Sequence, residues 1–460
     1  MSDRRQKNQL ELAFPVVATG EARSEAEKGT ETPAVAPGGD SLAAPGPSME
    51  AIVERDNLKK ALAQVRRNKG APGVDGMTVD DLAPYLKDHW PEIRAQLLTG
   101  TYRPLPVRRV EIPKATGGLR PLGIPTVLDR FIQQAALQVL QAAWDPSFSE
   151  HSHGFRPGRS TQGAVRAAQA YIAAGDRYVV DLDIEKFFDR VNHDILMGLV
   201  AKRVADRRLR RLIRGFLTAG VLADGLVGPT DEGTPQGGPL SPLLSNLMLD
   251  ELDRELERRG HRFVRYADDC NIYVRSRRAG ERVMASVAGF LARRLKLRLN
   301  PAKSAVAVPP QRKFLGFSFT SGMPRRRIAP QALARFKSRV RELTRRTRGA
   351  SLAQIVEELS RYLVGWRGYF GFCETPSVLR GLDQWVRRRL RAIAWKQWKR
   401  GRTRFAELRR RGVGKALAAQ SAGSPHGPWR LSNSPALTIA LPNAFLGSLG
   451  LATLAPATTA

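Results

Sequence analysis

The sequence predicts an α+β catalytic body followed by a basic helical bundle. Two observations predict the body: strand-like and helix-like segments alternate up to about residue 320, and two of the apolar strand-like segments end in acidic residues. A third observation predicts the bundle, because residues 331–420 hold 23 Lys and Arg against 6 Asp and Glu, a net charge of +17, with apolar residues at helical spacing. A chain of 460 residues has room for two or three domains.

The N-terminal elements follow from composition and spacing. Residues 1–50 are rich in Ala, Pro, Gly, Ser and Glu without sustained periodicity, which indicates a flexible leader. Residues 105–125 are typical of a short hairpin that turns at paired glycines, and a helix from about Leu128 to Ala143 follows. We therefore expect the catalytic body to occupy residues 51–325.

The C-terminal elements are predicted by caps and apolar stripes. The segment Ser351-Leu352-Ala353-Gln354 has the form of a capping box before a helix. A second helix is expected to carry one apolar stripe, made of Leu382, Val386, Leu390 and Ile393. We expect a basic helical domain at residues 326–420 and a tail at residues 421–460, which is rich in Pro, Ser and Leu and poorly patterned.

The overall charge and the cysteine content narrow the class of protein. A net charge of +32 and an isoelectric point of about 11.1 favour a polyanionic partner, because phosphate neutralisation releases counterions. We expect no membrane association and no secretory leader, since no run of 18 apolar residues and no basic-then-apolar N-terminus is seen. Cys270 and Cys373 are too few for a disulfide framework or a Cys-rich zinc site, so a reducing, cytoplasmic location is the default expectation.

The acidic residues at two strand ends predict a metal site. Asp268 and Asp269 are adjacent at a turn between two strand-like segments, and such a pair is costly unless a cation lies beside it. Asp183 ends a second strand about 85 residues upstream, and Asp181 shares its face one pleat away as a supporting or solvated residue. Asp183, Asp268 and Asp269 together could hold two Mg²⁺ ions for phosphoryl transfer. The alternative, a polar hairpin tip, does not explain the second acidic strand end.

Several short motifs follow one another along the chain: 71–77 (APGVDGM), 118–125 (GLRPLGIP), 153–160 (HGFRPGRS), 183–189 (DIEKFFD), 233–242 (GTPQGGPLSP), 266–269 (YADD) and 314–317 (FLGF). In this order, over about residues 50–420, the chain resembles bacterial group II intron-encoded reverse transcriptase/maturases. The resemblance implies a right-hand polymerase with fingers and palm, built from an antiparallel sheet plus helices. An α-helical thumb, or maturase X domain, would follow.

The resemblance assigns roles around the metal site. It implies metal binding by Asp183, Asp268 and Asp269, with the Ile184 carbonyl as a further ligand. Lys114 and Arg120 would grip the incoming triphosphate, although both could be solvated surface residues.

Further roles concern the nucleotide and the primer. Phe188 would lie beneath the sugar and exclude a ribose 2′-hydroxyl, whereas Phe187 fits the core. Gln236 would contact the nucleotide beside the templating base pair, with a plain turn as the alternative. Lys303 is a phosphate contact more readily than a proton donor to pyrophosphate. Leu315-Gly316 resembles the primer grip, with a hydrophobic strand as the alternative.

The basic bundle matches the family's thumb region. Arg387, Arg388, Arg389 and Arg391 would contact RNA, while most of the Trp residues nearby fit the bundle core. His153 and His193 are expected to be structural residues. No cysteine cluster for a C-terminal HNH-type nuclease is seen, so a primer would have to come from elsewhere.

The function expected from these motifs is RNA-directed DNA synthesis with two Mg²⁺ ions. Its partners would be an intron RNA template, a DNA primer or target, and dNTPs, and the protein would also assist intron splicing and mobility. Two alternatives remain open: a splicing-only maturase, and a reverse transcriptase of a retron or defence system.

Overall fold

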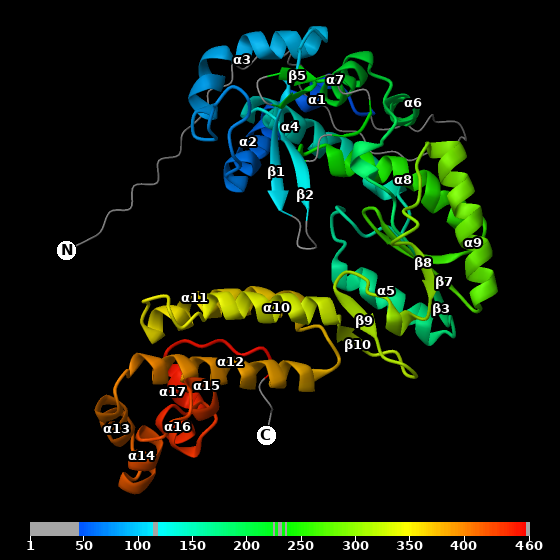
Figure 1. Cartoon of the computed structure of the whole chain (residues 1–460). Coiled ribbons are helices and arrows are strands. Elements are labelled where there is room, and N and C mark those ends of the chain that lie inside the picture. Colours follow the sequence, from blue (N-terminus) through cyan, green and yellow to red (C-terminus); the bar gives the residue numbers. More distant parts are fainter. Residues whose placement is uncertain (1–45, 114–117, 224–225, 229–231, 235–236, 457–460) are drawn as a thin grey trace, which may run out of the picture. The chain divides into compact units, whose positions relative to one another are not determined.

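A computed structural model describes residues 46–456 except 114–117, 224–225, 229–231 and 235–236 (Figure 1). The chain divides into two compact units. The first comprises Met1–Ser160, Leu182–Cys270 and Glu281–Ala305. The second comprises Thr161–Asp181, Asn271–Gly280 and Val306–Ala460.

The helices of the N-terminal half begin at side-chain caps and bury one apolar face. Thr126 caps α4 by accepting a hydrogen bond from the Asp129 backbone N–H, and Phe131 and Leu140 of this helix are fully buried. The elements in this half are α1 (Met49–Ile52), α2 (Arg55–Asn68), α3 (Leu82–Thr99), α4 (Val127–Trp144), η1 (Asp145–Ser147), α5 (Thr161–Ala173), η2 (Phe187–Asp189), α6 (His193–Arg203) and α7 (Arg207–Leu217).

The predicted hairpin is present and belongs to a larger sheet. Strands β1 (Val107–Pro113) and β2 (Leu119–Ile124) pair antiparallel, and β4 (Val221–Ala223) and β5 (Leu226–Gly228) extend the sheet in the order β2-β1-β4-β5. The β1–β4 pairing is parallel, so this sheet is mixed. The two strands β9 (Phe317–Phe319) and β10 (Arg326–Ile328) form a separate antiparallel ribbon.

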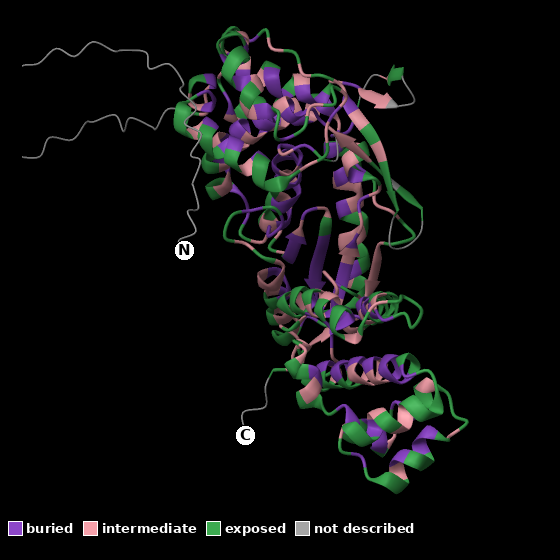
Figure 2. Ribbon diagram, turned by 90° about the vertical axis from the view of Figure 1, so that its left-hand side faces the viewer, coloured by how far each residue is buried: buried purple, intermediate pink, exposed green. Residues whose placement is uncertain are grey.

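A second four-stranded sheet holds the acidic strand ends. Its order is β6-β7-β3-β8, from β6 (Arg262–Tyr266), β7 (Asp269–Val274), β3 (Tyr178–Leu182) and β8 (Ala305–Ala307). Figure 2 shows the strands of this sheet as largely buried, and Val179, Val180, Phe263, Val264 and Ile272 are all at most 2% exposed. The helices next to it in sequence are α8 (Ser241–Arg258) and α9 (Arg277–Phe290), which runs on into a π-helical turn at η3 (Leu291–Leu295).

The basic region folds as the predicted helical bundle. Ser351 and Gln354 form the capping box, which begins α11 (Leu352–Phe370), and α12 (Pro376–Gln397) buries the predicted stripe of Leu382, Val386, Leu390 and Ile393. The remaining elements are η4 (Pro309–Gln311), α10 (Pro330–Leu343), α13 (Gly401–Arg410), α14 (Lys415–Ala422), α15 (Pro428–Leu431), α16 (Pro435–Ala440) and α17 (Asn443–Ser448).

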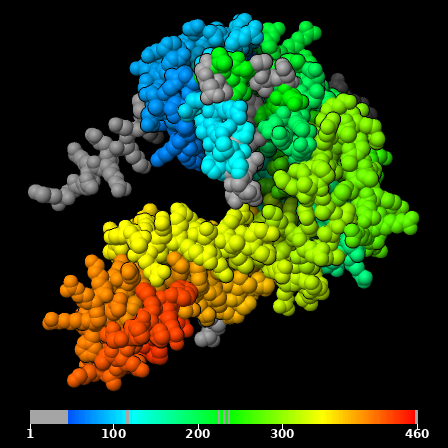
Figure 3. Space-filling view, in the orientation of Figure 1, coloured from blue at the N-terminus to red at the C-terminus, as the bar shows by residue number. Residues whose placement is uncertain are grey.

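The tail after residue 420 folds against the bundle, although its sequence showed no clear pattern. Leu446 and Leu454 complete the apolar core of α10–α12, and Leu437 and Leu441 complete a second core around Trp395. The carboxylate of Asp383 accepts hydrogen bonds from the backbone N–H groups of Leu454 and Ala455, at 2.9 and 3.0 Å. Figure 3 shows the red C-terminal segment lying among the orange residues that precede it in the sequence.

Among the residues that the structure describes, no helix is both long enough and apolar enough to cross a membrane.

Candidate active site

The predicted acidic turn lies between two neighbouring strands. Tyr266 ends β6, Ala267 and Asp268 form the turn, and Asp269 begins β7. Ala267 has a φ of +56°, a conformation that costs a non-glycine residue free energy, so the surrounding structure must hold it in place. Asp268 is half-buried and Asp269 is exposed, which leaves both carboxylates near solvent.

A buried arginine beneath this turn holds its backbone. Arg265 is 1% exposed and donates from Nε and Nη2 to the Asp253 carboxylate, at 2.8 and 2.5 Å. Its Nη1 donates to the Ala267 carbonyl at 2.9 Å and to Asn246 Oδ1 at 3.0 Å. Burial alone would lower the pKa of the Arg265 guanidinium, but the Asp253 carboxylate raises that pKa, so the guanidinium keeps its charge. All three guanidinium nitrogens of Arg265 thus have a hydrogen-bond partner, as a buried charge requires.

A glycine completes the support of the turn. The Asn246 amide donates to the Gly154 carbonyl at 2.8 Å, which joins α8 to the loop that carries the sequence His153-Gly154-Phe155. A Cβ at Gly154 would lie 2.3 Å from the Ala267 nitrogen, so only glycine allows this close approach of two backbones. The same loop pairs with β6, because the His153 N–H donates to the Arg265 carbonyl at 2.8 Å and the Arg265 N–H donates to the His151 carbonyl at 2.9 Å.

Asp183 directly follows the last residue of β3, and the loop after η3 holds it there. Its carbonyl accepts from the Asn300 N–H at 2.8 Å, and its own N–H donates to Ser304 Oγ at 3.0 Å. Lys303 Nζ lies 3.4 Å from Asp183 Oδ2, so the lysine predicted to contact phosphate stands beside a predicted metal ligand. Ile184, the further predicted ligand, is 4% exposed and forms an isolated antiparallel bridge with Leu299.

The two acidic positions belong to adjacent strands, because β3 and β7 are neighbours in the sheet. Carboxylate oxygens are the hard ligands that Mg²⁺ prefers, so the donor set fits this ion. No group of three or more His, Cys, Asp or Glu side chains that could hold a metal is present among the described residues. The two-metal site therefore stays a prediction. Asp181, which lies on β3 two residues before Asp183, forms an ion pair with Arg312 at 2.6 Å.

The residues predicted to contact the nucleotide are described in part. Phe188 is half-buried and packs edge-on against the buried Phe187 at a centroid distance of 5.3 Å, which agrees with a core role for Phe187. The Phe188 carbonyl accepts from the Thr234 N–H at 2.7 Å, so the block that begins at Gly233 lies against it. Arg120 lies in β2 opposite Ile112, but its side chain falls outside the described atoms. Lys114 and Gln236 lie outside the described residues.

The predicted primer grip is a tight turn rather than a plain strand. Leu315 and Gly316 have φ values of +51° and +82°, and the backbones of Phe314 and Phe317 hydrogen-bond to one another across them. The Tyr369 hydroxyl of α11 donates to the Leu315 carbonyl at 2.9 Å. A Cβ at Gly316 would lie 3.1 Å from the Phe370 ring, so this turn fits closely against α11.

Three of the four arginines predicted to bind RNA have partners inside the bundle. Arg388 donates to the Trp429 carbonyl at 3.1 Å and lies over the Trp429 ring at 4.0 Å. Arg389 donates to Thr344 Oγ1 at 2.6 Å, and Arg391 donates to the Leu441 carbonyl at 3.1 Å. Burial lowers the pKa of both Arg389 and Arg391. These three side chains thus join α12 to its neighbours, whatever else they contact.

The two histidines expected to be structural are both buried, but only His193 has a hydrogen-bond partner for its ring among the described residues, because His153 Nδ1 is buried without one. His193 is buried, and its Nε2 hydrogen-bonds with the Gly233 carbonyl at 2.6 Å. Burial, aided by the nearby positive charges of Arg159 and Arg156, lowers the pKa of His153 to about 4, so this ring is neutral at pH 7.

The sequence motifs do not predict the support beneath the acidic turn, which is made by Arg265, Asp253 and Asn246. The one signal for it in the sequence is an arginine within the apolar strand Phe263-Val264-Arg265. A charged side chain in such a strand needs a buried partner of opposite charge.

Comparison with known proteins gives this site its class. Residues 112–319 match the family described as reverse transcriptase (RNA-dependent DNA polymerase), and residues 333–412 match the group II intron, maturase-specific domain. Protein YkfC of Escherichia coli K12 is 36% identical over 295 residues, which are 55% of this chain and 77% of YkfC. Group II intron-encoded protein LtrA of Lactococcus lactis subsp. cremoris is 41% identical over 204 residues, which are 44% of this chain and 34% of LtrA.

Solved structures give a looser likeness. A partial Cas6-RT-Cas1–Cas2 complex aligns with 25% identity and a TM-score of 0.35, over 53% of this chain and 42% of that chain. The chain thus spans about three quarters of YkfC but only a third of LtrA.

The matched domains define an RNA-directed DNA polymerase with a polymerase body and a helical maturase region. The chain belongs to the group II intron-encoded reverse transcriptase/maturases, which confirms the family, fold class and enzyme class predicted from the sequence. Neither alternative, a splicing-only maturase or a retron-type enzyme, is favoured. The domains imply an RNA template and DNA substrates, and enzymes of this family use divalent metal ions.

Proposed function

We propose that this protein copies intron RNA into DNA at the YADD turn and that it binds the same RNA through its basic bundle to assist splicing. The observation that carries the proposal is the arrangement of the acidic strand ends. Asp183 follows β3, Asp269 begins the neighbouring β7, and Asp268 lies in a turn that a buried ion pair supports. Carboxylates on adjacent strands suit divalent cations and a triphosphate.

The chain's own residues divide the work of nucleotide transfer. Asp183, Asp268 and Asp269, with the Ile184 carbonyl, would hold two Mg²⁺ ions. When bound, these ions would lower the pKa of the primer 3′-hydroxyl and neutralise the triphosphate. Lys303 Nζ lies 3.4 Å from Asp183 Oδ2, at the edge of this site, and would contact a phosphate of the substrate there.

The remaining contacts orient the substrates. Phe188 would exclude a ribose 2′-hydroxyl by its bulk, and Lys114, Arg120 and Gln236 would bind the incoming dNTP. The turn at Leu315-Gly316, with both residues at positive φ, would present its backbone to the primer terminus.

The RNA contact of the bundle rests on side chains that its packing leaves available. Arg387 has no partner among the described residues, whereas Arg388, Arg389 and Arg391 also bind neighbouring elements. The bundle's net charge of +17 over 90 residues is greater than a well-solvated surface needs. A cytoplasmic location belongs to this proposal, because two cysteines give no disulfide framework.

The proposal can be tested with Asp268→Asn. We expect cDNA synthesis on an RNA template to fall below about a thousandth of wild type, because metal coordination supplies several kcal/mol of transition-state stabilisation. RNA affinity should stay within about twofold, since phosphate contacts dominate it. The matched control is Asp181→Asn, a carboxylate on β3 that Arg312 holds, which should retain synthesis. Equal loss of synthesis and RNA binding in Asp268→Asn would contradict the proposal.

A further inference from the structure

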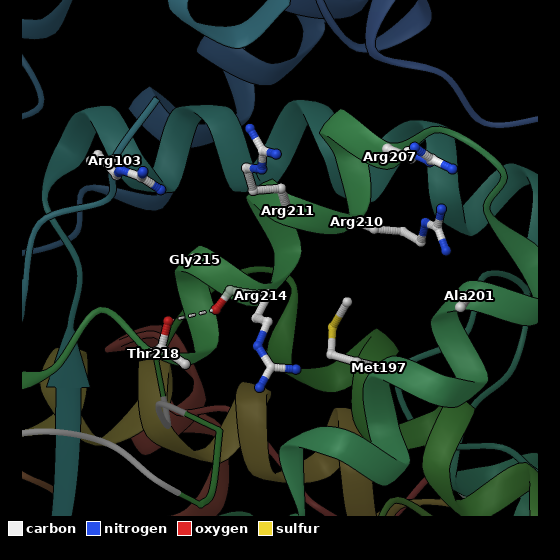
Figure 4. A pocket seen from close by; sticks show the side chains of 9 residues that line it. All are labelled: Arg103, Met197, Ala201, Arg207, Arg210, Arg211, Arg214, Gly215 and Thr218. Carbon is white, nitrogen blue, oxygen red and sulfur yellow. Dashed lines mark hydrogen bonds between the residues drawn. The ribbon is translucent and has the colours of Figure 1, made fainter. Parts of the chain in front are cut away.

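A recess lined by arginines lies in the first unit, outside the residues of the active site. It has a volume of about 540 Å³, and its lining includes Arg103, Arg207, Arg210, Arg211 and Arg214 (Figure 4). Four of these arginines come from α7, and Arg103 precedes β1. Met197 and Ala201 of α6 add an apolar part to the lining.

These arginines are poorly matched by carboxylates. Arg214 forms an ion pair with Asp194 at 3.0 Å, and both side chains are more than half exposed. No carboxylate of the described chain forms an ion pair with the other four, and none lines the recess, although Arg211 Nη1 donates to the Gly100 carbonyl at 3.3 Å. Arg210 has a buried Nε without a hydrogen-bond partner among the described residues, and its Nη2 reaches only the Ala205 carbonyl at 3.5 Å. Five like charges are therefore gathered here, and among the described residues the exposed Asp194 is the one carboxylate paired with any of them.

Another arginine of the same helix shows the contrast. Arg208 donates to Asp206 at 2.9 Å and pairs with Glu50 at 2.7 Å, and these bonds raise the pKa of its guanidinium. Asp206 also caps α7, accepting from the backbone N–H groups of Arg208 and Leu209. The fold thus supplies acids to the arginine that anchors α7 and supplies almost none to those that line the recess.

A phosphate chain fits this arrangement. The guanidinium group is planar, keeps its charge and donates in a fork that matches phosphate oxygens, so five of them suit several successive phosphates. A surface that served solubility alone would mix charges of both signs. The orphaned Nε of Arg210 is a further donor that an anion could satisfy.

We propose that this recess binds the phosphate backbone of RNA, as a second RNA contact besides the basic bundle. The inference rests on the proposed function, which makes RNA the polyanion that this chain handles both as template and as splicing partner. It adds Arg103 and α7, which lie outside the sequence motifs and outside the matched maturase domain at residues 333–412, although α7 is part of the matched reverse transcriptase segment at residues 112–319.

The test is the salt dependence of binding by the full-length protein to a fluorescein-labelled 30-base-pair RNA hairpin. The triple variant Arg207→Gln/Arg210→Gln/Arg211→Gln should bind more weakly at every salt concentration. The slope of log K against log salt should fall by about three, one for each lost phosphate contact. The control removes three exposed arginines elsewhere, as Arg275→Gln/Arg278→Gln/Arg282→Gln, at the same cost in net charge, and should leave the slope within about one of wild type.

Two further measurements separate binding from folding and from catalysis. Thermal unfolding and primer extension on poly(rA)/oligo(dT) should stay close to wild type in the recess variant. The charge-keeping triple variant Arg207→Lys/Arg210→Lys/Arg211→Lys should recover most of the slope, which a folding defect would not allow.

The outcomes distinguish the two proposals. If wild type binds the hairpin and extends the primer while the recess variant keeps the wild-type slope, the recess proposal is wrong and the proposed function stands. If wild type neither binds RNA nor extends a primer, both fail. A loss with the RNA hairpin supports the recess, whereas a loss seen only with a DNA duplex of the same sequence overturns its assignment to RNA.

Discussion

Helices α7 and α12 are both rich in arginine, yet the fold uses the two sets differently. On α12, Arg388, Arg389 and Arg391 donate to carbonyl and hydroxyl groups of neighbouring elements and are half-buried. On α7, Arg207, Arg210, Arg211 and Arg214 line an open recess with one exposed carboxylate partner among them. The number of arginines on a helix therefore does not tell which arginines can bind a polyanion. Their availability depends on whether the fold already gives them hydrogen-bond or ion-pair partners.

Arg265 is the most deeply buried of the arginines compared here. Removing its partner, Asp253, should therefore have the largest effect on the free energy of unfolding. Asp253→Asn leaves a fully buried guanidinium without its counter-charge, so we expect a loss of about 3–5 kcal/mol in the free energy of unfolding. Primer extension should fall as well, because the Ala267 carbonyl loses its fixed donor. Denaturant unfolding and primer extension measure the two effects.

The control for this change lies on the same helix. Glu257→Gln removes a carboxylate that pairs with the half-exposed Arg254, and exposed pairs contribute little. We expect a change within about 0.5 kcal/mol. If Asp253→Asn were as mild as Glu257→Gln, Arg265 would not be the support of the turn.

The contrast between α12 and α7 should appear in a pair of alanine variants. Arg389→Ala removes the bonds to Thr344, a fully buried residue, and should cost about 1–3 kcal/mol of unfolding free energy. Arg207→Ala, with no partner among the described residues, should cost less than about 0.5 kcal/mol. Thermal or denaturant unfolding measures both losses of unfolding free energy. Similar losses in the two variants would mean that the arginines of α12 and α7 do not differ in structural role.

The smallest effect concerns His153, whose charge the surrounding arginines oppose. Its pKa is lowered from 6.5 to about 4 in the folded protein, chiefly by burial. The unfolded chain therefore binds the proton first, and His153 lowers stability as pH falls from about 6.5 to 4. Burial raises the pKa of Asp129 to about 6, which acts in the opposite direction at acid pH. His153→Gln should thus flatten the loss of stability on acidification relative to wild type, measured by unfolding at pH 7, 6 and 5.

Much of this molecule could be predicted from periodicity and spacing. The hairpin β1–β2, the helix α4 and the capping box of α11 all appear where local patterns indicated them. The family motifs likewise led to the correct enzyme class, because their order in the chain is specific. Local signals carry such features, since neighbouring residues determine them.

Features that depend on distant residues could not be predicted in the same way. Arg265 meets Asp253 across 12 residues and Gly154 meets Ala267 across more than a hundred, so their roles are visible only in the fold. Charge and the resemblance to the family's thumb region predict that the arginines of α12 contact RNA, but neither signal shows that their bonds reach the end of α10 and the tail. The tail itself has short helices whose apolar residues are buried because they pack into the cores that contain Trp395 and Leu390.

The contacts of Asp383 with Leu454 and Ala455 set a lower limit on the size of any excised maturase fragment. The matched segment ends at residue 412, but both apolar cores of the bundle also contain leucines from the tail, which are Leu437, Leu441, Leu446 and Leu454. A fragment cut at the end of the match would present both cores to water and would invite aggregation. Anyone who wishes to graft this region onto another polymerase should carry about forty further residues with it.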